Sequence, residues 1–201
     1  QRLSAAGHPL AGHGWDHRAR QNRSVFHHLH SVLLSRDAAE HLSRPGHELM
    51  ALVLRCHAWF ARHDLLVGPL YVPPAWAVGR LARLDQQALP FALMETLGGV
   101  TRLRDQTRQR LPLTGYEADN SMRATFLSAS NRFNRVLGSR MGRMLRIGLH
   151  PFDLRYLLAD QLIADLQRVT QFCDYSGLLR LQTSDLPVMP LGQGQQGGNR
   201  T

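Results

Sequence analysis

The stretch LLVGPLYVPPAW, residues 65–76, decides the fold. Leu65 to Val72 is an apolar run of the length of one buried strand, and Pro73-Pro74 ends it because proline has no N–H to donate to a sheet. The segment before it, Glu48 to His63, repeats apolar residues at the spacing of one helical face, and Pro45-Gly46 marks its start. This order of helix and strand predicts an α/β fold.

The same alternation extends outward in both directions. Upstream, Gln1 to Ala6 has the pattern of a helix end, and Pro9 to Gly12 predicts a short strand that leads into His13. Downstream, we expect a short helix at Trp76 to Leu84 and a strand at Phe91 to Thr96. A long helix at Asp119 to Leu137, a strand at Met144 to Leu149 and a final helix at Tyr156 to Val169 should follow. Such an order favours parallel strands in a barrel or an open sheet, with polar functional groups at the strands' C-terminal ends.

Length and composition indicate one compact α/β domain. The chain has 201 residues, 43% of them hydrophobic, and we assign residues 1–190 to the domain and 191–201 to an unstructured tail that contains GQGQQGGNRT. We expect no membrane span, because no apolar run approaches the roughly 20 residues that a bilayer crossing needs. The first residues also lack the basic-then-apolar pattern of a secretion signal.

The basic balance of the chain does not by itself predict a nucleic-acid partner. Arginine supplies every one of the 24 Lys+Arg residues, against 15 Asp+Glu, which gives a formal net charge of +9. An acidic residue, Asp105, lies among the clustered arginines of 102–110, and no aromatic stacking platform accompanies these arginines or those of 140–146. We therefore expect these arginines to form a solvated basic surface and not to bind nucleic acid. Cys56 and Cys173 have no CxxC partner, and we expect both to be ordinary core residues.

The most informative local cluster is His13-Gly14-Trp15-Asp16-His17, at the end of the first predicted strand. Two imidazoles four residues apart come close together in a turn, and imidazole is the commonest zinc ligand, so His13 and His17 are candidate metal ligands. The alternative is that these are solvated loop residues, since a chain with 11 histidines places some of them four apart by chance.

Two further segments carry candidate chemistry. His150 follows an apolar run and precedes Pro151, which makes it a candidate general acid or, alternatively, a capping or core histidine. Ala75 and Trp76 follow a stiff proline pair. The backbone N–H of Ala75 or Trp76 could face an oxyanion, and the Trp76 indole could stack on a sugar. The structural alternative is a rigid turn with a buried Trp. GxGxxG, Walker-type and GxSxG motifs are absent from the sequence.

Taken in order, Gly7-His8, HGWDH at 13–17, VPPAW at 72–76 and LHP at 149–151 resemble the polysaccharide deacetylase superfamily, NodB-like or carbohydrate esterase family 4, and within it the DUF2334 branch. The resemblance covers most of the chain and implies a distorted (β/α) barrel. It implies metal-assisted removal of an N-acetyl or O-acetyl group from a carbohydrate or an N-acetylated small molecule. His13 and His17 match the two metal-binding histidines, and His150 matches the histidine that protonates the leaving group.

The sequence departs from that family in two places. Family members carry an Asp on a strand before the histidine motif. This Asp is the third ligand to Zn²⁺ or a similar divalent metal, and in typical members this strand also supplies the catalytic base. In this chain no Asp or Glu precedes His13. The prolines at 73 and 74 also lack the adjacent Arg of typical members. We therefore expect an N-terminally incomplete deacetylase-like domain with an unpaired sheet edge, prone to association.

Three functions remain in competition at this point. The first is a metal-dependent deacetylase-like hydrolase that uses His13, His17 and His150. The second is a non-catalytic carbohydrate-binding or interaction module that keeps the aromatic residues Trp15 and Trp76. The third, which we rank last, is a basic nucleic-acid binder, whose affinity would fall steeply with salt.

Overall fold

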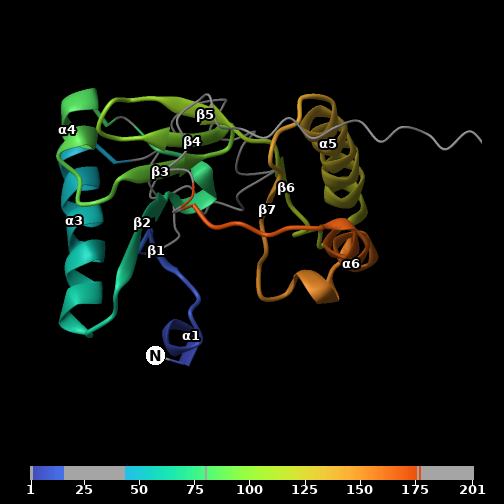
Figure 1. The fold of residues 1–201 in the computed structure, drawn as a ribbon, viewed down its shortest axis with the longest axis horizontal. Helices are drawn as coiled ribbons and strands as arrows, with labels where there is room; N and C mark the ends of the chain where they lie inside the picture. Colours follow the sequence, from blue (N-terminus) through green and yellow to red (C-terminus); the bar gives the residue numbers. More distant parts are fainter. Residues whose placement is uncertain (1, 16–43, 80, 176, 178–201) are drawn as a thin grey trace, which may run out of the picture.

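A mixed five-stranded sheet forms one half of the molecule (Figure 1). The computed structural model describes residues 2–15, 44–79, 81–175 and 177. The sheet order is β1-β2-β3-β4-β5, with strands β1 (Leu10–His13), β2 (Val67–Val72), β3 (Leu93–Thr96), β4 (Gly99–Arg102) and β5 (Arg108–Arg110). The first three strands are parallel and the last two continue antiparallel. A separate parallel pair joins β6 (Leu113–Thr114) to β7 (Arg146–Ile147).

The helices divide between the two ends of the molecule. α3 (Gly46–Arg62) and α4 (Arg83–Gln87) lie beside the five-stranded sheet, whereas α5 (Ser121–Arg140) and α6 (Ala159–Arg168) lie beyond the β6–β7 pair, and α1 (Arg2–Ala5) precedes β1 (Figure 1). One core cluster packs Val53 and Cys56 of α3 against Tyr71 and Phe91. Another surrounds Tyr116, between α5 and α6.

The predicted α/β class is confirmed, and the strand arrangement is more mixed than expected. The described strands do not close into a barrel. The parallel order of β1, β2 and β3 follows the predicted alternation, but the hairpin partner β4 and the strand β5 were missed. Their sequences, GVTR and RQR, carry little apolar signal, and they form because the turn after β3 returns the chain along its edge.

The predicted helix from Trp76 to Leu84 is wrong. A 3-10 turn, η3 (Pro74–Trp76), ends at the residue where that helix was to begin, and α4 begins only at Arg83. Ala75, Trp76 and Gly79 have φ values of 52°, 56° and 74°, a left-handed conformation that a right-handed helix cannot accommodate.

Helix α5 presents its predicted apolar face to solvent. The stripe that suggested a helix, at Met122, Phe126, Ala129, Phe133 and Val136, is exposed; the Phe133 side chain, for example, is 66% exposed. The opposite face is buried and consists of Arg123, Leu127, Asn131 and Gly138. The spacing therefore predicted the helix correctly, but the face that it marks is not the buried one.

Other expectations are settled by burial or lie outside the described residues. Cys56 is buried as expected, but Cys173 is exposed, because it lies in the extended segment that follows α6. Arg146, which we expected on a solvated surface, is only 6% exposed. The tail 191–201 lies outside the described residues. Among the helices that the structure describes, none combines the length and apolar character required to cross a bilayer.

Candidate functional site

Four of the predicted site residues line one cavity. His13 at the end of β1, Ala75 and Trp76 after β2, and His150 after β7 all border a space of about 900 Å³, which we call the sheet-end cavity. Its remaining walls include Glu95 of β3, Arg146 of β7 and Tyr175. The C-terminal ends of β1, β2, β3 and β7 therefore meet where the alternation of elements predicted that functional groups would gather.

The other two predicted residues are not part of this lining. Trp15 is 40% exposed and its ring lies under the Arg55 guanidinium, whose Cζ is 4.4 Å from the ring centroid. It does not border the sheet-end cavity among the described residues. His17 lies outside the described residues, so the expected pair with His13 is untested.

The His13 ring is oriented by the neighbouring strand. Its Nδ1 lies within hydrogen-bond distance of the Val72 carbonyl oxygen, the residue that pairs with His13 in the β1–β2 ladder. A carbonyl oxygen only accepts, so Nδ1 carries the proton and the neutral ring has its acceptor lone pair on Nε2. A backbone partner on one ring nitrogen is the usual arrangement of a histidine that binds a metal or a proton through the other.

The turn after β2 fixes the Trp76 side chain against the cavity. The Trp76 backbone N–H donates to the Pro73 carbonyl at 2.8 Å, and the indole Nε1–H donates to Glu95 Oε1 at 3.0 Å. Of the two N–H groups expected to face an oxyanion, that of Trp76 is therefore engaged, and that of Ala75 has no partner among the described residues. The left-handed conformation of Ala75 and Trp76 costs free energy and is retained by these bonds.

A buried ion pair that sequence reasoning missed forms the floor of the cavity. Arg146 Nη1 donates to Glu95 Oε1 at 2.6 Å, and the guanidinium also donates to the carbonyls of Thr96, Leu97 and Leu111. The two charged side chains are 5% and 8% exposed. Arg146 thus joins β7, which leads to His150, to the sheet that carries His13 and Trp76.

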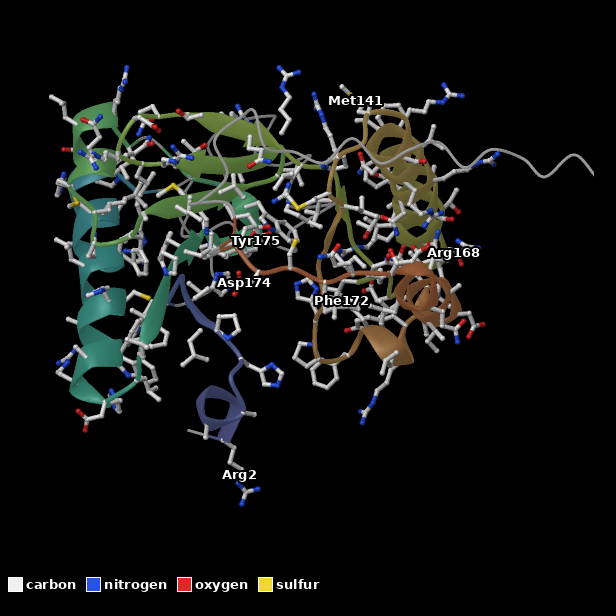
Figure 2. All side chains as sticks on the ribbon, in the orientation of Figure 1. Arg2, Met141, Arg168, Phe172, Asp174 and Tyr175 are labelled. Atoms are coloured by element: carbon white, nitrogen blue, oxygen red, sulfur yellow. The ribbon has the colours of Figure 1, made fainter. Side chains whose placement is uncertain are left out.

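Tyr175 completes this network from the far end of the chain. The segment after α6 returns toward the five-stranded sheet, so that Asp174 and Tyr175 lie close to it while Phe172 lies nearer α6 (Figure 2). Burial raises the pKa of the Tyr175 hydroxyl above its ordinary range, and the negative charge of the neighbouring Glu95 carboxylate raises it further. The hydroxyl therefore stays protonated beside Glu95.

His150 stands beside a buried carboxylate. Its backbone N–H donates to Asp153 Oδ2 at 2.8 Å, and its ring Nδ1 is 3.7 Å from the same oxygen. The His150 side chain is 44% exposed and Asp153 is 1% exposed. The ring also meets Trp76 edge to face, with centroids 6.5 Å apart. This geometry lets Asp153 orient an imidazole that remains accessible from the cavity.

The described residues supply one suitable metal ligand and not a complete site. His13 fits because its Nδ1 is held by a backbone carbonyl. The cavity's Glu95 does not fit, because Arg146 and Trp76 already occupy its Oε1. Within the described ranges no three His, Cys, Asp or Glu side chains are grouped closely enough to hold an ion.

The sequence signals for these residues differ in kind. Their positions at the ends of predicted strands made His13, Trp76 and His150 candidates, and the structure brings these three residues together. Nothing in the local sequence distinguished the buried Arg146 from the exposed arginines before it. Comparisons of the chain with family models, with curated proteins and with solved structures gave no match.

Proposed function

We propose that the sheet-end cavity binds an acetylated carbohydrate and hydrolyses its acetyl group, as the motif resemblance to the polysaccharide deacetylases implies. The observation that supports this proposal is the convergence of His13, Ala75, Trp76 and His150 on one cavity from separate strands. Its volume of about 900 Å³ lies within the range of about 300–1,000 Å³ that is usual for ligand sites.

In this proposal each side chain has a role that its contacts permit. Trp76, held by Glu95, is the rigid aromatic wall against which a sugar ring packs. His150 donates a proton to the departing sugar nitrogen or oxygen, and Asp153 is the positioning residue that holds the imidazole. The Ala75 N–H, which has no partner among the described residues, would hydrogen-bond the developing oxyanion.

The metal belongs to the same proposal. A divalent ion such as Zn²⁺, held through His13 and His17, would polarise the acetyl carbonyl and activate water. The five-stranded sheet and the β6–β7 pair would then be parts of one distorted (β/α) barrel of the deacetylase type. Among the described residues His13 is the one suitable ligand, and no group of three His, Cys, Asp or Glu side chains completes a site.

A non-catalytic carbohydrate-binding module is the second candidate. It is favoured by the state of Glu95, which Arg146, Trp76 and Tyr175 surround and which is therefore poorly placed to act as a catalytic base. The aromatic wall of Trp76 would then hold a sugar without turnover, and binding would be insensitive to a chelator.

Acetate release from an N-acetylchitooligosaccharide and from an acetylated xylan, with and without added Zn²⁺, tests the two candidates. We expect His150→Ala to lower the rate by about 10²- to 10⁴-fold, the contribution of a general acid. His47→Ala, which removes an exposed imidazole on α3, is the matched control and should not change it. Binding without acetate release would favour the binding module, and no interaction with either glycan would overturn both candidates.

A further inference from the structure

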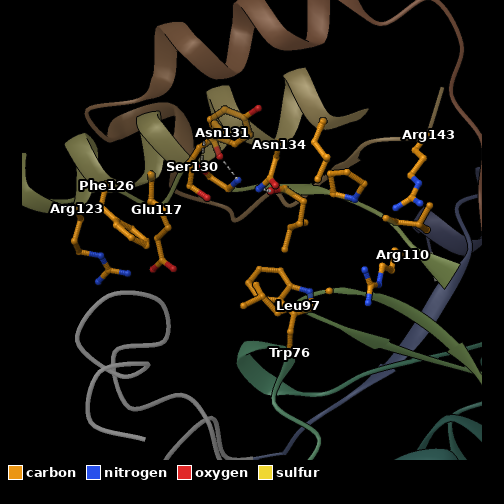
Figure 3. A pocket seen from close by; sticks show the side chains of 18 of the residues that line it. Trp76, Leu97, Arg110, Glu117, Arg123, Phe126, Ser130, Asn131, Asn134 and Arg143 are labelled. Carbon is orange, nitrogen blue, oxygen red and sulfur yellow. Dashed lines mark hydrogen bonds between the residues drawn. The ribbon is translucent and has the colours of Figure 1, made fainter. Parts of the chain in front are cut away.

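A second cavity lies between α5 and the strands β5 and β6. It has a volume of about 440 Å³, and we call it the α5 cavity (Figure 3). Helix α5 supplies Phe126, Leu127 and Leu137 to one wall, and Leu97, Leu111 and Trp76 face them from the sheet side. The two cavities adjoin and share part of their lining, namely Trp76, Leu113, Glu117 and His150.

Three arginines give this mainly apolar cavity a positive charge. Arg110, Arg123 and Arg143 line it together with one acidic residue, Glu117, which leaves a formal charge of +2. Arg110 and Arg143 lie at the same end of the cavity, whereas Arg123 and Glu117 lie at the other (Figure 3). Neither Arg110 nor Arg143 has a carboxylate partner among the described residues.

Arg123 is a buried cation that is paired with one carboxylate. It is 4% exposed, its nearest carboxylate oxygen, Asp119 Oδ1, is 3.7 Å from Nε, and that Nε has no hydrogen-bond partner in the described structure. A buried charge of this kind is costly unless an anion compensates it. Arg123 therefore has its counter-ion at one end of the cavity, whereas no carboxylate among the described residues balances Arg110 and Arg143 at the other end.

The polar amides of the cavity are engaged by the backbone. Asn131 accepts from the Gly115 N–H at 3.1 Å and donates to its carbonyl at 2.8 Å, and Asn134 donates to the Leu113 carbonyl at 2.8 Å. These bonds fix α5 against β6 and keep the wall rigid. An incoming ligand therefore meets a preformed apolar surface with cationic groups at its ends.

We propose that the α5 cavity binds an amphipathic anion, with a carboxylate or phosphate group held by Arg110 and Arg143 and an apolar body along α5. Guanidinium groups bind both of these anions through charge-assisted hydrogen bonds, and the apolar walls exclude a free inorganic ion as the preferred occupant. The inference does not depend on the proposed hydrolysis, because Arg110 and Arg143 have no role in it, although Trp76 and His150 border both cavities.

Calorimetric titration of the full chain below the micelle concentration tests the proposal. The probes are dodecanoate, dodecyl phosphate, dodecanol and inorganic phosphate. We expect one of the two amphipathic anions to bind with one site per chain and with affinity that falls as salt is raised, and dodecanol and phosphate to bind at least about tenfold more weakly. The stronger of the two anions identifies the head group as carboxylate or phosphate.

Two variants locate the site. Arg110→Gln/Arg143→Gln should weaken binding by about tenfold or more, whereas Arg104→Gln/Arg140→Gln, which removes two exposed arginines outside the cavity, should not. Ser130→Trp, which fills the cavity without changing charge, should abolish binding while circular dichroism shows a folded chain. Equal weakening by both double variants, tight binding by Ser130→Trp, or no binding of either anion to the wild type would overturn the proposal.

Discussion

Replacing Arg146 by Met should destabilise the protein more than any exposed arginine substitution. The side chain of Arg146 is 5% exposed and donates to Glu95 and to the carbonyls of Thr96 and Leu97. The Met side chain has a volume similar to that of Arg, so the variant loses the charge and hydrogen bonds of Arg146 without leaving a cavity. Removing one partner of a buried ion pair costs about 3–5 kcal/mol, because the other charge stays buried. That is a large part of a total stability of about 5–15 kcal/mol.

Urea denaturation, followed by circular dichroism, measures this loss. The control is Arg102→Met, which removes an ion pair at the surface. The Arg102 and Asp105 side chains are 34% and 45% exposed, and their charged groups are 3.2 Å apart. The loss of this pair should cost about 1 kcal/mol or less. In the double variant Glu95→Leu/Arg146→Met both charges are gone, and we expect part of the lost stability to return. An Arg146→Met cost no larger than that of Arg102→Met, or purely additive losses in the double variant, would refute this account of the cavity floor.

Three further predictions concern α5, pH and the turn after β2. Leu127→Ala should cost about 2–5 kcal/mol by urea denaturation because Leu127 is buried, whereas Phe133→Ala should cost under about 1 kcal/mol; the reverse order would mean that α5 faces the other way. Burial and Glu95 raise the pKa of Tyr175, so the folded state holds a proton that the unfolded chain releases near pH 10. The stability that the protonated Tyr175 contributes is complete below about pH 10 and is lost as the pH rises further. In that range the free energy of unfolding should fall by up to about 1.4 kcal/mol per pH unit because of Tyr175, and Tyr175→Phe should make the fall less steep; an unchanged slope in this variant would contradict the prediction. Ala75→Gly should raise the thermal midpoint by relieving a φ of 52°, an effect of about 0.5–1 kcal/mol, and a lower midpoint would show that the turn is not strained.

Association of the chain connects the sequence expectation with the α5 surface. We predicted an unpaired sheet edge and a tendency to associate, and the structure adds an exposed apolar stripe that includes Met122 and Phe133. Large exposed apolar side chains favour contact with another surface. Light scattering should detect association, and Phe133→Ser should reduce it; a stable wild-type monomer would contradict the expectation.

Local sequence patterns predicted the elements better than their environment. The apolar run before Pro73 became β2, and the spacing of Glu48 to His63 became α3, because both patterns depend on neighbours along the chain. The apolar pattern of α5 does not mark its buried face, because Arg123 and Asn131 are accommodated by contacts with Asp119 and Gly115 that are not visible in the helix sequence. Periodicity specifies a helix but not which partner covers it.

The convergence of the candidate residues was predictable where it depended on strand ends and not where it depended on long-range pairing. His13, Trp76 and His150 each follow a strand, and parallel strand ends meet at one edge. The Glu95–Arg146 pair joins residues 51 positions apart, and its burial follows from the approach of β7 to the turn after β3. No local property of an arginine in a basic segment indicates that approach.

The proposed function requires His13, Trp76 and His150 to border one ligand site. An NMR titration with tetra-N-acetylchitotetraose, observing the two histidine rings and the Trp76 indole N–H, tests it directly, with the indole of Trp59 on α3 as an internal reference. The account predicts that the three cavity signals shift together and saturate with one dissociation constant while Trp59 stays unchanged. Cavity signals that do not move, that saturate at different concentrations, or that move less than Trp59 would contradict it.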